Sequence, residues 1–158
     1  MTEPAVSEVC IDASIAAKLV LNEDRSDLAS SLWRGWEDAD VDVIAPALIT
    51  WEVANAIRVA ASRGRIDRSS VAELYHAFRE LPITLIPHYE MPQVAWEQFV
   101  LGRGLTVSPY DATYLATAVV TSCDLWTADD RLVRTVGDDL PLVRTLSEVV
   151  DDALEEPQ

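Results

Sequence analysis

Short runs of apolar residues alternate along the chain with longer segments in which apolar side chains recur every three or four positions. This alternation of strand-like and helix-like patterns favours a mostly parallel sheet covered by helices. The short runs predict strands at residues 9–11, 41–45, 83–86 and 125–127, with an edge strand at 142–143. The periodic segments predict helices at residues 15–21, 24–37, 48–62, 68–80, 92–101, 108–121, 129–136 and 147–154. Because no internal repeat or low-complexity linker interrupts them, we expect a single α/β domain over residues 1–150 and an acidic tail over 151–158.

The composition, 49% hydrophobic and 25% charged over 158 residues, suits one folded domain with a sizeable core. The longest stretch without a charged side chain, residues 112–123, falls well short of the roughly 20 residues that span a bilayer. Acidic residues, among them Glu8 and Asp12, precede the first basic residue, Lys18, which is unlike a secretory leader. We therefore expect a protein that acts in the cytoplasm and not in a membrane.

The net charge of −15 repels nucleic acid at long range and argues against loose, sequence-independent coating of DNA. A phosphate-bearing substrate would therefore need a local positive charge at its binding site to offset this repulsion. Eleven of the twelve basic residues are Arg, and this bias together with the acidic surplus suggests adaptation to high salt. Cys10 and Cys123 lie in apolar segments without metal-site spacing, and we expect them to be buried, inert thiols.

Two aspartates follow predicted strands directly. Asp12 comes after the run 9–11, and Asp129 follows the run 125–127. In open α/β sheets ligands bind in the crevice at the carboxyl ends of the strands, so both side chains should point into one crevice. The alternative reading of Asp12 is an Asx-turn or a helix cap, and Thr127 could likewise cap the helix that Asp129 begins.

Two more carboxylates belong to strongly apolar helices. Glu52 lies in a predicted helix that is apolar on nearly every side, and such a helix is usually enclosed. Asn55 shares the face of Glu52, so the two could present a carboxylate and an amide to one ligand. Asp111 completes a capping box that begins at Ser108, which also offers a purely structural explanation for it. For Glu52 the structural explanation is a surface position near the helix start.

A parallel sheet can bring these four carboxylates side by side, where their mutual repulsion costs several kcal/mol unless cations neutralise it. Oxygen ligands supplemented by water suit Mg²⁺ or Mn²⁺, which also favour phosphate oxygens. A bound divalent ion would attract the phosphate that the acidic protein otherwise repels. The pattern therefore indicates phosphate-ester chemistry.

The same residues resemble the PIN-domain nucleases, and in particular the VapC-type toxins of toxin–antitoxin pairs. The resemblance spans residues 8 to about 145 and rests on four motifs in order: Cys10 to Ser14 (CIDAS), Glu52 to Asn55 (EVAN), Ser108 to Ala116 (SPYDATYLA) and Thr127 to Asp129 (TAD). It implies a PIN-like three-layer α/β/α fold with a four- to five-stranded mostly parallel sheet. It further implies single-stranded RNA as substrate, homodimerisation, and inhibition by a cognate antitoxin protein.

By the same resemblance, the metal-binding and catalytic carboxylates are Asp12, Glu52, Asp111 and Asp129, and the supporting polar positions are Ser14, Asn55 and Thr127. Asp130 beside Asp129 leaves the fourth ligand open between the two. The implied reaction is hydrolysis of an RNA phosphodiester assisted by one or two Mg²⁺ or Mn²⁺ ions, with Glu52 completing the metal shell or orienting the attacking water.

Two other classes compete with this interpretation. In a catalytically inactive PIN-fold binding or scaffold module the carboxylates would serve only as caps, although the presence of all four favours an enzyme. Aspartyl-phosphate proteins also cluster aspartates at strand ends, but they need a lysine after a later strand, and Lys18 lies in the first helix.

One basic cluster, Arg58, Arg63, Arg65 and Arg68, follows the helix of Glu52. Cations at a helix end complement its dipole, and this structural role is as well supported as contact with RNA or an acidic partner.

Overall fold

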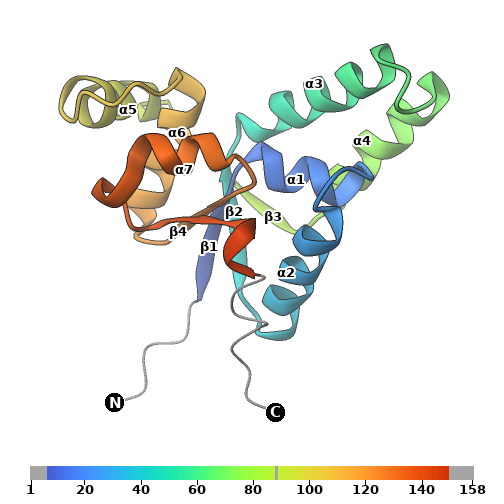
Figure 1. Cartoon of the computed structure of the whole chain (residues 1–158), viewed down its shortest axis with the longest axis horizontal. Helices are drawn as coiled ribbons and strands as arrows, with labels where there is room; N and C mark the ends of the chain where they lie inside the picture. The colour runs from blue at the N-terminus through green and yellow to red at the C-terminus, as the bar shows by residue number, and fades with distance from the viewer. Residues whose placement is uncertain (1–6, 88, 150–158) are drawn as a thin grey trace.

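A five-stranded sheet forms the centre of the computed structural model, which describes residues 7–87 and 89–149 (Figure 1). The strand order is β3-β2-β1-β4-β5, and each neighbouring pair is parallel, which confirms the predicted parallel sheet. The predicted acidic tail lies outside the described residues. The strands are β1 (Glu8–Ile11), β2 (Asp42–Pro46), β3 (Ile83–Ile86), β4 (Asp124–Thr127) and β5 (Val143–Thr145).

Helices cover the sheet in two groups. The first four contact one another, whereas α5 and α6 pack together and α6 crosses β1, β2 and β4, which gives the three-layer arrangement (Figure 1). No helix of the described ranges is both long and apolar enough to cross a membrane. The helices are α1 (Ala13–Val20), α2 (Ser26–Asp38), α3 (Ile49–Ser62), α4 (Val71–Arg79), α5 (Met91–Ala95), α6 (Pro109–Thr121) and α7 (Asp130–Val136).

Several predicted boundaries differ from the structure for local reasons. Helix α2 begins at Ser26 because Arg25 has a left-handed backbone with φ of 61°. The predicted helix 92–101 divides into α5 and a π-helical segment, Trp96–Leu101. That segment ends at Gly102, where an added Cβ would lie 2.8 Å from the carbonyl oxygen of Glu97. Of the last predicted helix, residues 147–149 are helical and residues 150–154 lie outside the described part.

The two strongly apolar helices, α3 and α6, differ in how much of their surface is buried. The expectation that the Glu52 helix is enclosed is wrong, because α3 buries one face, formed by Ile49, Val53, Ile57 and Ala60. Trp51 on another face is 77% exposed. Helix α6 is the enclosed one, and its residues from Ala112 to Ala118 are all buried. The sequence of α6 is rich in small residues, which lets it pack closely against the sheet.

The strand order places the functional end of the sheet. The chain proceeds from β1 to β2 and β3 on one side and then returns to add β4 and β5 on the other, so the direction reverses between β1 and β4. Such a switch point leaves a crevice at the carboxyl ends of the two strands. Asp12 follows β1 and its amide donates to the carbonyl of Trp126 in β4 (3.2 Å), which places Asp12 at this crevice.

Candidate active site

Asp12 is the most buried carboxylate of the crevice, with 7% of its surface exposed. It is the N-cap of α1, and its Oδ1 accepts hydrogen bonds from the backbone amides of Ser14 (2.9 Å) and Ile15 (3.3 Å). The predicted cap is therefore real. A cap on a surface helix leaves its carboxylate in water, whereas this one is enclosed, so capping alone does not explain its position.

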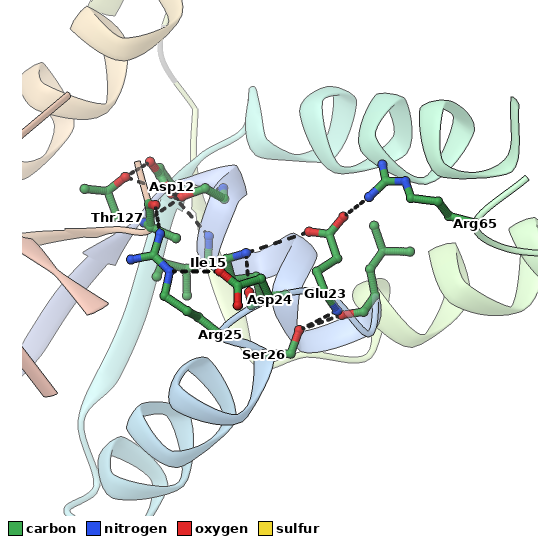
Figure 2. A network of polar contacts seen from close by, with 12 residues as sticks. Asp12, Ile15, Glu23, Asp24, Arg25, Ser26, Arg65 and Thr127 are labelled. Atoms are coloured by element: carbon green, nitrogen blue, oxygen red, sulfur yellow. Dashed lines mark hydrogen bonds and ion pairs between the residues drawn. The ribbon is translucent and has the colours of Figure 1, made fainter. Parts of the chain in front are cut away.

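Two hydroxyl groups hold the Asp12 carboxylate from both sides. The Ser14 hydroxyl donates to Oδ1 at 2.5 Å. The Thr127 hydroxyl donates to Oδ2, also at 2.5 Å (Figure 2). The loop after β4 supports both hydroxyls, because the amide of Ala128 donates to Ser14 Oγ (2.8 Å) and that of Asp129 to Thr127 Oγ1 (3.0 Å). The carboxylate is thus fixed in orientation by two residues, Ser14 and Thr127, that are 113 positions apart in the chain.

Burial raises the pKa of the Asp12 carboxyl to about 6, even though the hydrogen bonds from Ser14, Thr127 and the helix amides lower it. Near neutral pH the carboxylate therefore remains largely ionised in a site that disfavours its charge. A positive ligand would relieve this cost.

Glu52 reaches the same region from α3. One of its carboxylate oxygens accepts a 2.6 Å hydrogen bond from the hydroxyl of Tyr114 in α6. Partial burial raises the pKa of Glu52, the Tyr114 hydrogen bond lowers it, and the charges of Asp12 and Asp111 raise it again. The three carboxylates therefore interact electrostatically. Burial and the neighbouring Glu52 hold the pKa of Tyr114 far above its usual range, so the phenol stays a donor.

Asp111 takes part in the predicted capping box at the start of α6. Its amide donates to Ser108 Oγ (3.0 Å), and that hydroxyl donates to its Oδ2 (2.8 Å). This arrangement satisfies one of the two carboxylate oxygens through Ser108. The half-buried side chain still contributes to the field at Glu52.

Asp129 and Asp130 occupy different surroundings. Asp129 lines the cavity of the site but also caps α7, where its Oδ1 accepts from the amide of Arg131 (2.9 Å). The expectation that Thr127 caps this helix is wrong, because Asp129 is the N-cap. The Thr127 hydroxyl instead donates to Asp12 and accepts from the amide of Asp129. Asp130 points elsewhere and accepts from Thr145 (2.9 Å) and Arg25 (3.3 Å), contacts that lower its pKa.

A cavity of about 720 Å³ opens here, and Glu52 and Asp129 are the candidate carboxylates that line it. One wall is a stripe of α3 that includes Trp51, Glu52 and Asn55, and the other is the stripe of α1 from Ala13 to Lys18. Ser14 and Asp129 also line it, together with Tyr110 from the start of α6. The amide oxygen of Asn55 accepts from Arg58 (3.0 Å), which belongs to the predicted basic cluster.

The donor chemistry of the site fits a hard divalent cation, because Asp12, Glu52, Asp111 and Asp129 offer only oxygens. The first three interact electrostatically, and Asp129 lines the same cavity as Glu52. Within the described residues, however, no three His, Cys, Asp or Glu side chains are close enough together to hold a metal ion as they stand. Mg²⁺ often binds through one or two carboxylates and several waters, so the donor set remains suitable for it.

Two contact residues were missed from the sequence. Tyr114 belongs to the SPYDATYLA motif, where the pattern predicts no role for it, although a tyrosine on an apolar helix needs a hydrogen-bond partner for its hydroxyl. Arg25 donates to the carbonyl of Ala128 (2.7 Å) and pairs with Asp130, and so braces the loop that carries Asp129. The hydrophobic pattern places Arg25 inside the predicted helix 24–37 and gives it no role. In the structure its left-handed backbone ends the preceding loop, and α2 begins one residue later.

Arg65 of the basic cluster and the two cysteines have surroundings that explain them without a role in catalysis. Arg65 of the basic cluster forms a 2.7 Å ion pair with Glu23 across the end of α3 (Figure 2). Both cysteines are free thiols, and burial raises the pKa of each, which agrees with the expected inert character although Cys123 is only partly buried.

Comparison with known proteins returns related sequences and folds. The PIN domain family model matches residues 9–138. A VapC ribonuclease of Mycobacterium bovis and ribonuclease VapC9 of Mycobacterium tuberculosis are each 28% identical over 124 residues, covering 78% of this chain and 87% of theirs.

Among solved structures, M. tuberculosis VapC20, a Sarcin-Ricin loop cleaving toxin, is similar with a TM-score of 0.62 at 16% identity, covering 80% of this chain and 93% of that one. VapBC2 from Rickettsia felis, bound to a DNA fragment from its promoter, is similar with a TM-score of 0.61 at 8% identity, covering 87% and 98%. At these identities the structures establish a shared fold.

Proposed function

Because this chain belongs to the PIN domain family, we propose that its acidic crevice is the active site of a metal-dependent endoribonuclease, acting as the toxin of a toxin–antitoxin pair. The ribonuclease names of its sequence relatives support this activity. The observation that carries the site assignment is the enclosed Asp12 carboxylate, fixed by two hydroxyls and two amides beside Glu52.

The residues that would hold the cation are Asp12, Asp111 and Asp129, with Glu52 completing the shell or orienting the attacking water. Mg²⁺ or Mn²⁺ bound there would supply Lewis acidity and lower the pKa of a bound water near the scissile phosphate. The oxygen donors do not distinguish between the two ions, so either is proposed.

The chain itself contributes orientation. Ser14 and Thr127 hold the Asp12 carboxylate, and their hydrogen bonds favour its charged form. Tyr114 directs one oxygen of Glu52, which leaves the other free to accept a proton or a ligand. Arg25 restrains the loop of Asp129 through Ala128. Such supporting contacts are commonly worth 10- to 100-fold in metal affinity or activity.

Cleavage of single-stranded RNA by the purified chain tests the proposal. We expect cleavage with Mg²⁺ or Mn²⁺, none with a chelator, and none for Asp12→Asn or Asp111→Asn. Asp67→Asn is the matched control, because Asp67 is an exposed carboxylate without a side-chain cap bond. Cleavage by Asp12→Asn at the wild-type rate would defeat the assignment.

The antitoxin and the homodimer are further parts of the proposal. A VapBC complex among the structural neighbours supports an antitoxin protein as partner. Growth arrest on expression of the chain, relieved by Asp111→Asn, would support the toxin role. Sedimentation equilibrium would test the homodimer directly.

The ribonuclease names of the sequence relatives do not favour the alternative, a non-catalytic PIN-fold binding or scaffold module. A metal-dependent rise in melting temperature that vanishes in Asp12→Asn separates the two, since only a site that binds the ion is stabilised by it.

A further inference from the structure

Two aromatic side chains at the candidate site are unusually exposed. Trp51 is 77% exposed and Tyr110 is 58% exposed, and both line the cavity of about 720 Å³ beside the carboxylates. Burying a ring of this size would contribute roughly 2–3 kcal/mol, which the chain forgoes at both positions. Trp96 and Tyr89 are exposed as well, so it is their place at the cavity that sets Trp51 and Tyr110 apart. Their exposure at the rim of the cavity indicates a surface that contacts a ligand.

Each ring adjoins a site carboxylate along the chain. Trp51 immediately precedes Glu52 on α3, and the cavity-lining stripe continues from Trp51 to Asn55 one turn later. Tyr110 immediately precedes Asp111 and lies one turn before Tyr114 on α6. Because Tyr114 reaches Glu52, the start of α6 and the start of α3 face each other across the site. A ligand whose phosphate lies at the carboxylates would therefore meet a ring from each helix.

Charge excludes the commonest way of holding a nucleic acid. Among the described residues that line the cavity, Lys18 is the one cation, against Glu23, Glu52 and Asp129. The Lys18 ammonium already donates to the Asp24 carbonyl (2.7 Å) and pairs with Glu23 (3.9 Å). The cavity thus offers few cations for phosphates but two π-faces for bases.

We propose that Trp51 and Tyr110 form a stacking platform for unpaired bases that flank the scissile phosphate. This inference rests on the proposed nuclease function. It gives two residues a role in holding the single-stranded RNA that the PIN-domain resemblance implies, because bases inside a duplex are already stacked on each other and cannot stack on the rings. Stacking tolerates any base, and it is less sensitive to salt than phosphate contacts, which suits a chain of net charge −15.

The test is the affinity of the full chain for a fluorescein-labelled single-stranded RNA decamer, measured by anisotropy with Ca²⁺ and with the decamer checked for intact length afterwards. We expect Trp51→Ala and Tyr110→Ala each to weaken binding about 5- to 150-fold, the effect of losing one stacked base. An abasic decamer with the same phosphates should bind the wild type as weakly as it binds the variants. Between about 0.1 and 0.5 M salt the affinity should fall less than about tenfold, whereas six phosphate contacts would cost roughly 1,000-fold.

Two other exposed aromatics provide matched controls. Trp96 is 45% exposed and Tyr89 is 97% exposed, and neither lines this cavity, so Trp96→Ala and Tyr89→Ala should bind the decamer like the wild type. Unchanged far-UV circular dichroism would show that the exposed positions tolerate alanine.

Equal affinity of the wild type, Trp51→Ala and Tyr110→Ala for the decamer would overturn the platform. If these variants instead lost self-association in sedimentation equilibrium, the rings would belong to an interface between copies, which also overturns it. Metal-dependent cleavage with unchanged affinity would leave the nuclease proposal standing while the platform fails. Base-dependent binding without any cleavage would support the platform and count against the nuclease alone.

Discussion

The hydroxyl of Tyr114 donates a 2.6 Å hydrogen bond to the carboxylate of Glu52, and so joins the enclosed helix α6 to the half-exposed helix α3. This contact fixes one oxygen of a candidate catalytic carboxylate from a different helix, α6. It also gives the one buried phenol of α6 its partner.

Replacing Tyr114 with Phe tests this contact. We expect cleavage to fall about 10- to 100-fold, because Glu52 loses the donor that orients it. The free energy of unfolding should drop by about 1–3 kcal/mol, as for a hydrogen bond to a charged group. Cleavage rates and urea titrations measure the two effects. Tyr75→Phe, on a half-buried tyrosine that packs against Phe78, should change neither; equal losses in both variants would remove the special role of Tyr114.

Replacing Asp12 with Asn should stabilise the metal-free protein above about pH 6, where the wild-type carboxylate is ionised, and should abolish cleavage. The folded pKa of about 6 lies above the ordinary 3.8, so the folded state holds its proton where the unfolded chain has released it. The Asp12 contribution to stability is therefore complete below about pH 4 and is lost as the pH rises through 6, a loss on the order of 2–3 kcal/mol.

Urea titrations of the metal-free wild type and Asp12→Asn at pH 5 and pH 8 measure this effect. We expect the variant to lack the Asp12 part of the decline, and Mn²⁺ to stabilise the wild type alone at pH 8. An identical pH dependence in the two proteins would show that the Asp12 carboxylate is not destabilised by burial.

Thr127→Val keeps the shape of the side chain and removes one hydroxyl from Asp12. Since that hydrogen bond lowers the pKa of Asp12, its loss should raise the pKa further. Metal ligands must be deprotonated. As the pH is lowered, the Mn²⁺ affinity of the variant should therefore start to fall at a higher pH than that of the wild type. Calorimetric Mn²⁺ titrations from pH 5 to 8 would show this, with Thr135→Val as an exposed helical control. A curve that coincides with the wild type would argue against the Thr127 contact.

Asp129 and Asp130 should separate cleanly by substitution. We expect Asp129→Asn to lose cleavage, because Asp129 lines the cavity with Glu52. Asp130→Asn should retain cleavage but melt at a lower temperature, because it weakens the contacts with Arg25 and Thr145. The lowered pKa of Asp130 means that its stabilising contribution is present above the ordinary carboxyl pKa and is lost on acidification. The reverse pattern would make Asp130 the fourth ligand.

The sequence predicted the parallel sheet and most helices because the strand runs are short, apolar and separated by clear helical periods. It also placed Asp12 and Asp129 correctly after β1 and β4, since position after a buried strand is a local property. The contacts of Thr127 with Asp12 and of Ala128 with Ser14 follow from the pairing of β1 with β4, which periodicity alone does not give.

Features that depend on tertiary surroundings were harder to predict. The apolar composition of α3 predicts an enclosed helix, yet α3 buries only one face. Another face, which includes Trp51, lines the open cavity and is not covered by a neighbouring element. The left-handed Arg25 and the π-helical segment before Gly102 arise from local backbone geometry that a hydrophobic pattern does not encode.

The central claim, that carboxylates from separate segments hold a divalent cation at this crevice, is tested most directly by titrating the metal-free chain with Mn²⁺ and following the loss of the free-ion signal by electron paramagnetic resonance. We expect one or two ions to bind the wild type and Asp67→Asn, with binding strongly weakened in both Asp12→Asn and Asp111→Asn. Wild-type Mn²⁺ binding that persists unchanged in those two variants, or no binding by the wild type at all, would contradict the claim.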